Sequence, residues 1–128
     1  YCLAEAGALE LTLADIDTVR VAALAKGVQA AFPSCKVQVG PADPGGMELV
    51  VNATPVGMRP DDPLPLPVDR LTAAMTVADI IMEPRETRLL AEARRRGCTV
   101  QPGQPMMDCQ MQAMAEFFDV GRNHRNVG

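Results

Sequence analysis

The sequence is poor in aromatic residues and in the residue types that build metal sites. Among its 128 residues there is no Trp, one Tyr and three Phe, so the core must be built from aliphatic side chains and from the eight Met. One His and four cysteines far apart in the sequence form no Cys-x-x-Cys pair. This argues against a zinc site and favours free buried thiols. No metal ligand is expected.

The chain also lacks long apolar runs and an excess of positive charge. No segment approaches the roughly 20 apolar residues that span a bilayer, and the first residues have neither the charged region nor the cleavage site of a signal peptide. We therefore expect no membrane contact and a cytoplasmic location. The net charge is −4 and no basic face alternates with aromatics, which argues against nucleic acid as a partner. A hydrophobic content of 48% with 22% charged residues indicates one globular domain.

What the chain does contain is an alternation of predicted strands and helices. The expected strands are short apolar or alternating runs, at residues 9–14, 35–39, 49–51, 76–81 and 98–101. The expected helices lie at residues 19–32, 87–96 and 103–118, with the tail of another at 1–7 and a short helix or turn at 68–75. This order predicts an α/β fold, a Rossmann-like three-layer domain with a mostly parallel sheet. We expect this domain to span residues 1–120, and residues 121–128, with the lone His124, to be a polar tail.

Local signals predict where several helices begin and end. Asp17 or Thr18 can cap the helix that follows the first strand. Thr87 can cap the next helix, and Gly97 would stop it. The three arginines at 94–96 are cations in a last helical turn, where they favour the helix dipole. We expect them to be a solvated helix end.

Two other stretches allow more than one interpretation. Residues 59–67 contain four prolines, which fits an extended connector better than a polyproline recognition motif. In the last predicted helix, apolar side chains repeat at helical spacing: Met107, Met111, Met114 and Phe118. This stripe predicts a face packed in the core rather than a cofactor site.

Four motifs resemble, in the same order, those of the shikimate/quinate dehydrogenase family. Residues 52–58 read Asn-Ala-Thr-Pro-Val-Gly-Met, which resembles the family's Asn-Ala-Thr-Ser/Pro-x-Gly-Met. Residues 79–84 resemble its Asp-x-Val-Tyr-x-Pro, and residues 87–97 its Thr-x-Leu-Leu-x-x-Ala-x-x-x-Gly. Residues 103–110 resemble its Gly-x-x-Met-Leu-x-x-Gln. The resemblance covers the C-terminal, cofactor-binding half of such an enzyme.

The resemblance implies a Rossmann-like domain whose first strand and glycine-rich turn are missing from this sequence. In the family that turn, which holds a pyrophosphate at a helix N-terminus, directly precedes a helix like the one that ends at Gly7. The catalytic Lys and Asp belong to the family's N-terminal domain. We therefore expect no catalytic residue in this chain and no turnover by it alone. Monomer and homodimer both remain open.

The resemblance also implies which residues bind a nicotinamide dinucleotide. After the corresponding strand, NADP-dependent members carry Asn-Arg-Thr, whereas this chain has Asp15-Ile16-Asp17. A carboxylate there accepts hydrogen bonds from ribose hydroxyls and repels a 2′-phosphate, so we predict NAD rather than NADP. Arg20 would offset part of that repulsion, and Asp15 could instead cap a helix. The other expected cofactor contacts are Asn52, Ala53, Thr54, Pro55, Gly57, Ile80, Gly103, Met106 and Met107. At Asn52, Ala53, Thr54 and Gly57 we expect these contacts to come chiefly from backbone groups.

Two residues are expected to contact substrate, a small polyol acid. Gln110 matches the family's Gln, which hydrogen-bonds a ring hydroxyl. Met82 stands where the family has Tyr, and the loss of that hydroxyl changes which polyol is favoured among shikimate, quinate and their analogues. Gly57 should be required because a Cβ would crowd the cofactor or the turn. The alternative function is a non-catalytic α/β module that binds a nucleotide or serves as a scaffold.

Overall fold

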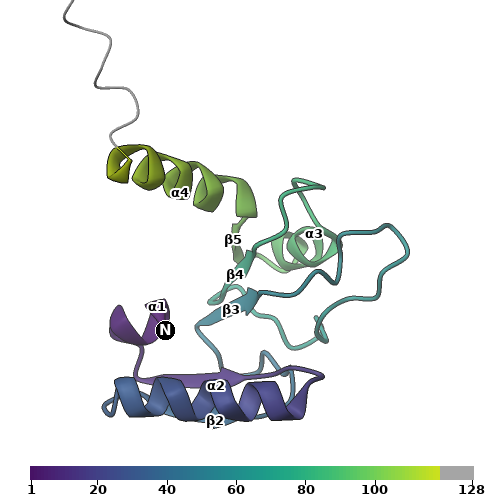
Figure 1. Cartoon of the computed structure of the whole chain (residues 1–128). Coiled ribbons are helices and arrows are strands. Elements are labelled where there is room, and N and C mark those ends of the chain that lie inside the picture. Colours follow the sequence, from purple (N-terminus) through teal and green to yellow (C-terminus); the bar gives the residue numbers. More distant parts are fainter. Residues whose placement is uncertain (119–128) are drawn as a thin grey trace, which may run out of the picture. The chain divides into compact units, whose positions relative to one another are not determined.

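The computed structural model describes residues 1–118, which form two compact units, residues 1–43 and the part that begins at Pro44 (Figure 1). The strands form two parallel sheets, one of two strands and one of three. The predicted α/β class with parallel strands is thus confirmed, although the sequence predicted one sheet. Each of the two ladders joins strands of a single unit.

The first unit contains helix α1 (Cys2–Glu5), strand β1 (Glu10–Leu13), helix α2 (Thr18–Ala31) and strand β2 (Lys36–Val39). The two strands pair in parallel. Parallel pairing requires a crossover connection, and α2 provides it. The small core of this unit consists of Ala4, Val28 and Cys35.

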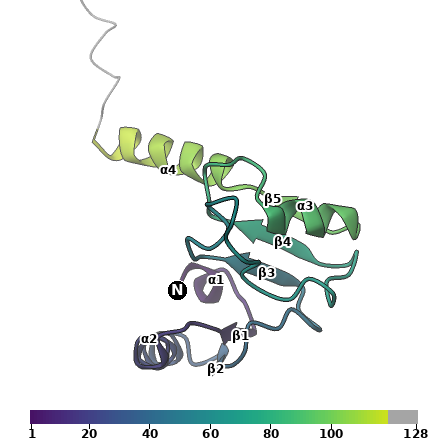
Figure 2. The same cartoon turned by 90° about the vertical axis from the view of Figure 1, so that its right-hand side faces the viewer.

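The second unit contains strands β3 (Leu49–Asn52), β4 (Thr76–Asp79) and β5 (Thr99–Gln101), and helices α3 (Arg88–Arg95) and α4 (Gly103–Phe117). The strands are parallel and follow the order β3-β4-β5. Figure 2 shows α3 along β4 and β5, against which it packs. The core of this unit is apolar and consists of Val50, Leu71, Met75, Val77, Leu89, Leu90, Ala93 and Cys98.

The local signals for helix ends are confirmed. Asp17, rather than Thr18, caps α2, because its carboxylate accepts a hydrogen bond from the backbone N–H of Arg20 at 2.9 Å. Thr87 caps α3 in the same way through its hydroxyl. Gly97 follows α3 with a φ of +82°, a conformation that favours glycine at a helix end.

Two segments outside the core also agree with the sequence. The arginines at 94–96 form ion pairs with Glu86 and Glu92. The side chains of the first two are 65% and 73% exposed, so this is a solvated helix end. Residues 59–67 form neither helix nor strand, as expected of a connector, and Leu64 and Leu66 anchor it on the core of the second unit.

The predicted core-facing stripe of α4 is wrong. Met111, Met114 and Phe118 are 58%, 47% and 65% exposed. Helical spacing identifies an apolar face but not the surface that covers it. Beyond the start of α4, none of the described helices or strands packs extensively against this helix, which projects from the end of β5 (Figures 1 and 2).

Candidate functional site

The loop after β3 is held by the side chain of Asn52, which is only 3% exposed. Its Nδ2 donates a hydrogen bond to the carbonyl oxygen of Val56 at 3.1 Å. Its Oδ1 accepts hydrogen bonds from the backbone N–H and the hydroxyl of Thr54, at 3.2 and 2.7 Å. The amide is therefore fully used inside the protein. A ligand at this strand end would meet backbone groups and the exposed side chains of Ala53 and Pro55.

Gly57 lies in a turn that a carboxylate holds in place. Its φ is +107°, and its N–H donates to Asp62 Oδ2 at 3.1 Å, as the N–H of Arg59 does at 3.0 Å. These backbone hydrogen bonds, that of Arg59 first, lower the pKa of Asp62 below its ordinary value of 3.8. An added Cβ on Gly57 would lie 3.6 Å from Cδ1 of Ile81, an ordinary contact. Glycine is thus required here by its backbone conformation rather than by lack of space.

The loop after β4 starts from a buried carboxylate. Asp79, 2% exposed, accepts hydrogen bonds from Asn52 Nδ2 at 3.2 Å, from the N–H of Ile81 at 3.1 Å and from Thr87 Oγ1 at 2.8 Å. The two expected ligand contacts of this loop differ in exposure: Ile80 is 38% exposed, and Met82 is half-buried. In the sequence, Asp79 was noted only as part of a motif. The prediction missed that its carboxylate accepts hydrogen bonds from three different parts of the chain.

Gly103 brings the start of α4 against the end of β4. A Cβ on this residue would lie 2.6 Å from the carbonyl oxygen of Ile80 and 2.7 Å from that of Ile81. Only glycine allows this approach of two backbones. Farther along α4, Met106 is 48% exposed and Gln110 is also exposed, whereas Met107 is half-buried.

The strand end of the first unit carries an exposed acidic cluster. Asp15 accepts hydrogen bonds from the N–H of Asp17 at 2.9 Å and from the guanidinium of Arg20 at 3.0 Å. The hydrogen bond from Asp17 and the adjacent guanidinium keep the pKa of Asp15 below 3.8. Asp15 is therefore not the helix cap, and the neighbouring Ile16 is fully exposed.

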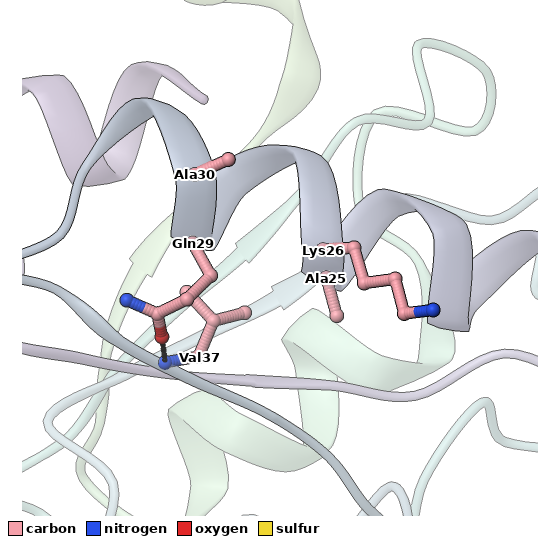
Figure 3. Close-up of a pocket in the computed structure, with 5 residues that line it drawn as sticks. All are labelled: Ala25, Lys26, Gln29, Ala30 and Val37. Carbon is pink, nitrogen blue, oxygen red and sulfur yellow. Dashed lines mark hydrogen bonds between the residues drawn. The ribbon is translucent and has the colours of Figure 1, made fainter.

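The surface of the described residues includes the following two shallow hollows. One, of about 400 Å³, lies between α2 and β2 and includes Gln29 and Val37 (Figure 3). It contains none of the predicted site residues. The other, also about 400 Å³, lies beyond β3 and β4 and is lined by Gly57, Met58, Arg59, Pro60, Glu83, Pro84, Glu86 and Arg88. This second hollow adjoins the predicted ligand loops.

The described part of the chain contains no group of three or more His, Cys, Asp or Glu that could hold a metal ion. Within the same residues, no helix is long and apolar enough to cross a membrane. The expected tail residue His124 lies outside the described residues.

Comparisons with known proteins identify relatives of this chain. No family model matches it. The chain is 40% identical over 108 residues to the shikimate dehydrogenase (NADP(+)) of Pseudarthrobacter chlorophenolicus. The aligned stretch covers 80% of this chain and 37% of the relative. The quinate dehydrogenase of Corynebacterium glutamicum, solved in complex with NAD, has a TM-score of 0.81 and 34% identity over 94% of this chain and 45% of its own. The ligand-free 5-ketofructose reductase of Gluconobacter sp. strain CHM43 has a TM-score of 0.83 and 28% identity, with the same coverage.

The chain thus spans less than half the length of each of these relatives. Within that span the sequence similarity and the fold agree, so the resemblance seen in the motifs is confirmed. In sequence and fold, the chain is thus similar to shikimate and quinate dehydrogenases, over a stretch that is consistent with part of their C-terminal cofactor-binding domain.

Proposed function

We propose that this chain is the dinucleotide-binding part of a dehydrogenase that acts on shikimate, quinate or a similar cyclic polyol acid. The observation that carries the proposal is the pair of ordered loops at the carboxyl ends of β3 and β4, where parallel α/β sheets bind ligands. The bound nicotinamide would supply the hydride chemistry, and the protein would supply placement. The domain would extend over residues 1–120, followed by the tail at 121–128.

The loops of the second unit support this proposal. Asn52 orders the loop after β3 without exposing its own amide, so the ligand would meet the backbone of that loop. Gly57 keeps an open turn beside Ile81. The proposed contacts of this unit are Asn52, Ala53, Thr54, Pro55, Gly57, Ile80, Gly103, Met106 and Met107.

The residues of the first unit favour NAD over NADP in this proposal. Asp15 is exposed and its lowered pKa keeps it charged near neutral pH, so its oxygens can accept hydrogen bonds from a ribose diol and would repel a 2′-phosphate. Arg20 pairs with Asp15 and its side chain is 69% exposed, so its positive charge would offset part of the repulsion of a 2′-phosphate. The relatives include both an NADP-dependent enzyme and an NAD complex.

The substrate would meet Met82 and Gln110. Gln110 is exposed on α4 and offers an amide to a ring hydroxyl. Met82 provides no hydroxyl, and the similarity to a 5-ketofructose reductase supports a polyol other than shikimate itself. A base or proton acceptor is needed near the reacting hydroxyl, and we place it outside these residues. The chain alone would then be inactive, and the whole enzyme would work in the cytoplasm.

The test is to express the full-length protein that contains this chain and to measure kcat/KM with NAD⁺ and NADP⁺ on shikimate and quinate. We expect oxidation of one such polyol, a preference for NAD⁺, and a reduced preference in Asp15→Asn. The matched control Asp69→Asn changes an exposed Asp in the second unit and should leave the preference unchanged. A preference for NADP⁺ would refute the cofactor choice. Failure to bind either dinucleotide would favour the scaffold alternative.

A further inference from the structure

Three buried polar side chains converge where β3 and β4 end and α3 begins. Asn52, Asp79 and Thr87 are 3%, 2% and 1% exposed, and they are the buried polar residues among those the structure describes. They come from three different elements. A buried polar group without a hydrogen-bond partner is strongly destabilising. Each of these three side chains therefore needs hydrogen-bond partners inside the protein. Within the described residues, no buried side-chain nitrogen or oxygen lacks a partner.

The hydrogen bonds of this group, which we call the exit network, converge on the carboxylate of Asp79. Thr87 Oγ1 donates to Asp79 Oδ2, while Asp79 Oδ1 accepts from Asn52 Nδ2. Thr87 also accepts the N–H of Leu90, which fixes its hydroxyl as a donor toward the carboxylate. Asp79 is therefore surrounded by donors only, its third being the N–H of Ile81.

We propose that Asp79, oriented by Thr87, is a positioning residue that holds the loops after β3 and β4 in fixed relation to each other. Its carboxylate fixes the Asn52 amide, and that amide in turn holds Thr54 and Val56. Asp79 also holds Ile81 directly. One carboxylate thus sets the conformation of both loops. The consequence for cofactor binding rests on the function proposed above, whereas the effect on the loops does not.

An amide in place of this carboxylate breaks the pattern while keeping its shape. Asp79→Asn presents one NH₂ group, and that group must face either Thr87 Oγ1 or the donors Asn52 and Ile81. If the NH₂ group faces Asn52 Nδ2 and the N–H of Ile81, donors face donors. If it faces Thr87 Oγ1 instead, the Thr87 hydroxyl loses its acceptor. Thr87→Val removes the hydroxyl altogether, whereas Thr87→Ser retains it and should rescue the network.

The experiment measures amide hydrogen exchange by NMR on the 128-residue chain and its variants. In Asp79→Asn and Thr87→Val we expect exchange of Thr54, Val56 and Ile81 to accelerate about tenfold or more, as expected from the loss of one buried hydrogen bond. Gly57 serves as an internal reference because Asp62, outside the network, holds its N–H. Its exchange should accelerate less. Thr87→Ser should stay close to wild type.

Val77→Ala is the matched control for a loss of stability. Val77 lies in β4, is fully buried, and belongs to the apolar core. This variant should lower the unfolding temperature without accelerating the loop amides more than those of the sheet. If Asp79→Asn changes the loops no more than Val77→Ala does, or if Thr87→Ser behaves like Thr87→Val, the positioning role is refuted.

The full-length enzyme gives a second measurement. Asp79→Asn should raise the KM for the dinucleotide more than it lowers kcat, and Val77→Ala should not. Binding of NAD⁺ or NADP⁺ by the wild-type enzyme tests the proposed function separately. A wild-type enzyme that binds neither would overturn that function while the exchange rates still decide the role of Asp79. Loops that respond without a change in KM would overturn the link between this network and cofactor binding.

Discussion

The strand ends of the two units carry similar polar side chains in opposite surroundings. After β1, Asp15 accepts hydrogen bonds from Asp17 and Arg20, which lie at most five residues along the chain, and all three residues are exposed. After β3 and β4, Asn52 and Asp79 are 27 residues apart in sequence, bonded to each other and buried. The first arrangement is local and screened by water, whereas the second depends on strand register. Substitutions should therefore alter ligand preference at the first end and loop geometry and stability at the second.

The largest loss should come from Gly103→Ala. The new methyl group would lie within 3 Å of the carbonyl oxygens of Ile80 and Ile81, so one backbone must move. We expect a destabilisation of about 1–3 kcal/mol or more, the range for overpacking in a close-packed region, measured by urea unfolding. Gln104→Ala, at the next and only half-buried position, is the control. Equal stability of the two variants would mean that the start of α4 is not tightly packed.

Gly57→Ala should have a smaller effect on stability. There is room for a methyl group, but the φ of +107° is unfavourable for any other residue. The expected destabilisation is about 1–2 kcal/mol from backbone strain, with weaker dinucleotide binding if this loop lies in the groove. The control is Ala53→Gly in the same loop. An unchanged unfolding midpoint would show that the turn relaxes without difficulty.

The turn at Gly57 should also respond to acid. The pKa of Asp62 is lower in the folded chain than its ordinary value of 3.8. The contribution of Asp62 to the stability of the fold is therefore fully present above pH 3.8, and it is lost as the pH falls through the lower pKa of the folded chain. The amide proton of Gly57 should therefore shift in NMR spectra as the pH is lowered from about 5 to about 2. Asp62→Asn should abolish this titration. A wild-type shift centred above 3.8 would contradict the assignment.

The smallest effect on stability should be that of Asp15→Asn. Asp15 and its partner Arg20 are exposed, and exposed ion pairs contribute little. The thermal midpoint at neutral pH should not change measurably, while the preference between the two dinucleotides should. A large drop in the thermal midpoint would mean that Asp15 stabilises the fold as the buried residues Asn52 and Asp79 do, which would contradict the difference described between the two units.

What could be predicted from the sequence is what depends on near neighbours. The caps Asp17 and Thr87 and the stop at Gly97 each act within one turn of helix, so residue type and spacing suffice. The order of strands and helices follows from periodicity in the same way. The motif at 52–58 indicated the loop after β3, and the structure shows how its first residue orders it.

What could not be predicted depends on partners distant in sequence. The bond between Asn52 and Asp79 exists because strand register places these residues opposite each other, and no local pattern specifies register. A sequence signal did exist: an Asp at the end of an apolar strand, followed eight residues later by the capping Thr87. The prediction that the apolar stripe on α4 packs in the core was wrong for the same reason, because an apolar face does not specify which surface covers it.

The hydrogen bond from the N–H of Val37 to Gln29 Oε1, at 3.0 Å, bears on the exposed edge of strand β2. Lys36 and Gly40 direct their N–H groups to the strand β1, so in a parallel ladder Val37 directs its own to the opposite edge. Unpaired edge groups are templates for strands of other molecules. By folding back from α2, the Gln29 side chain occupies that donor (Figure 3). This donor on the outer edge of β2 is thereby unavailable to a strand of another molecule.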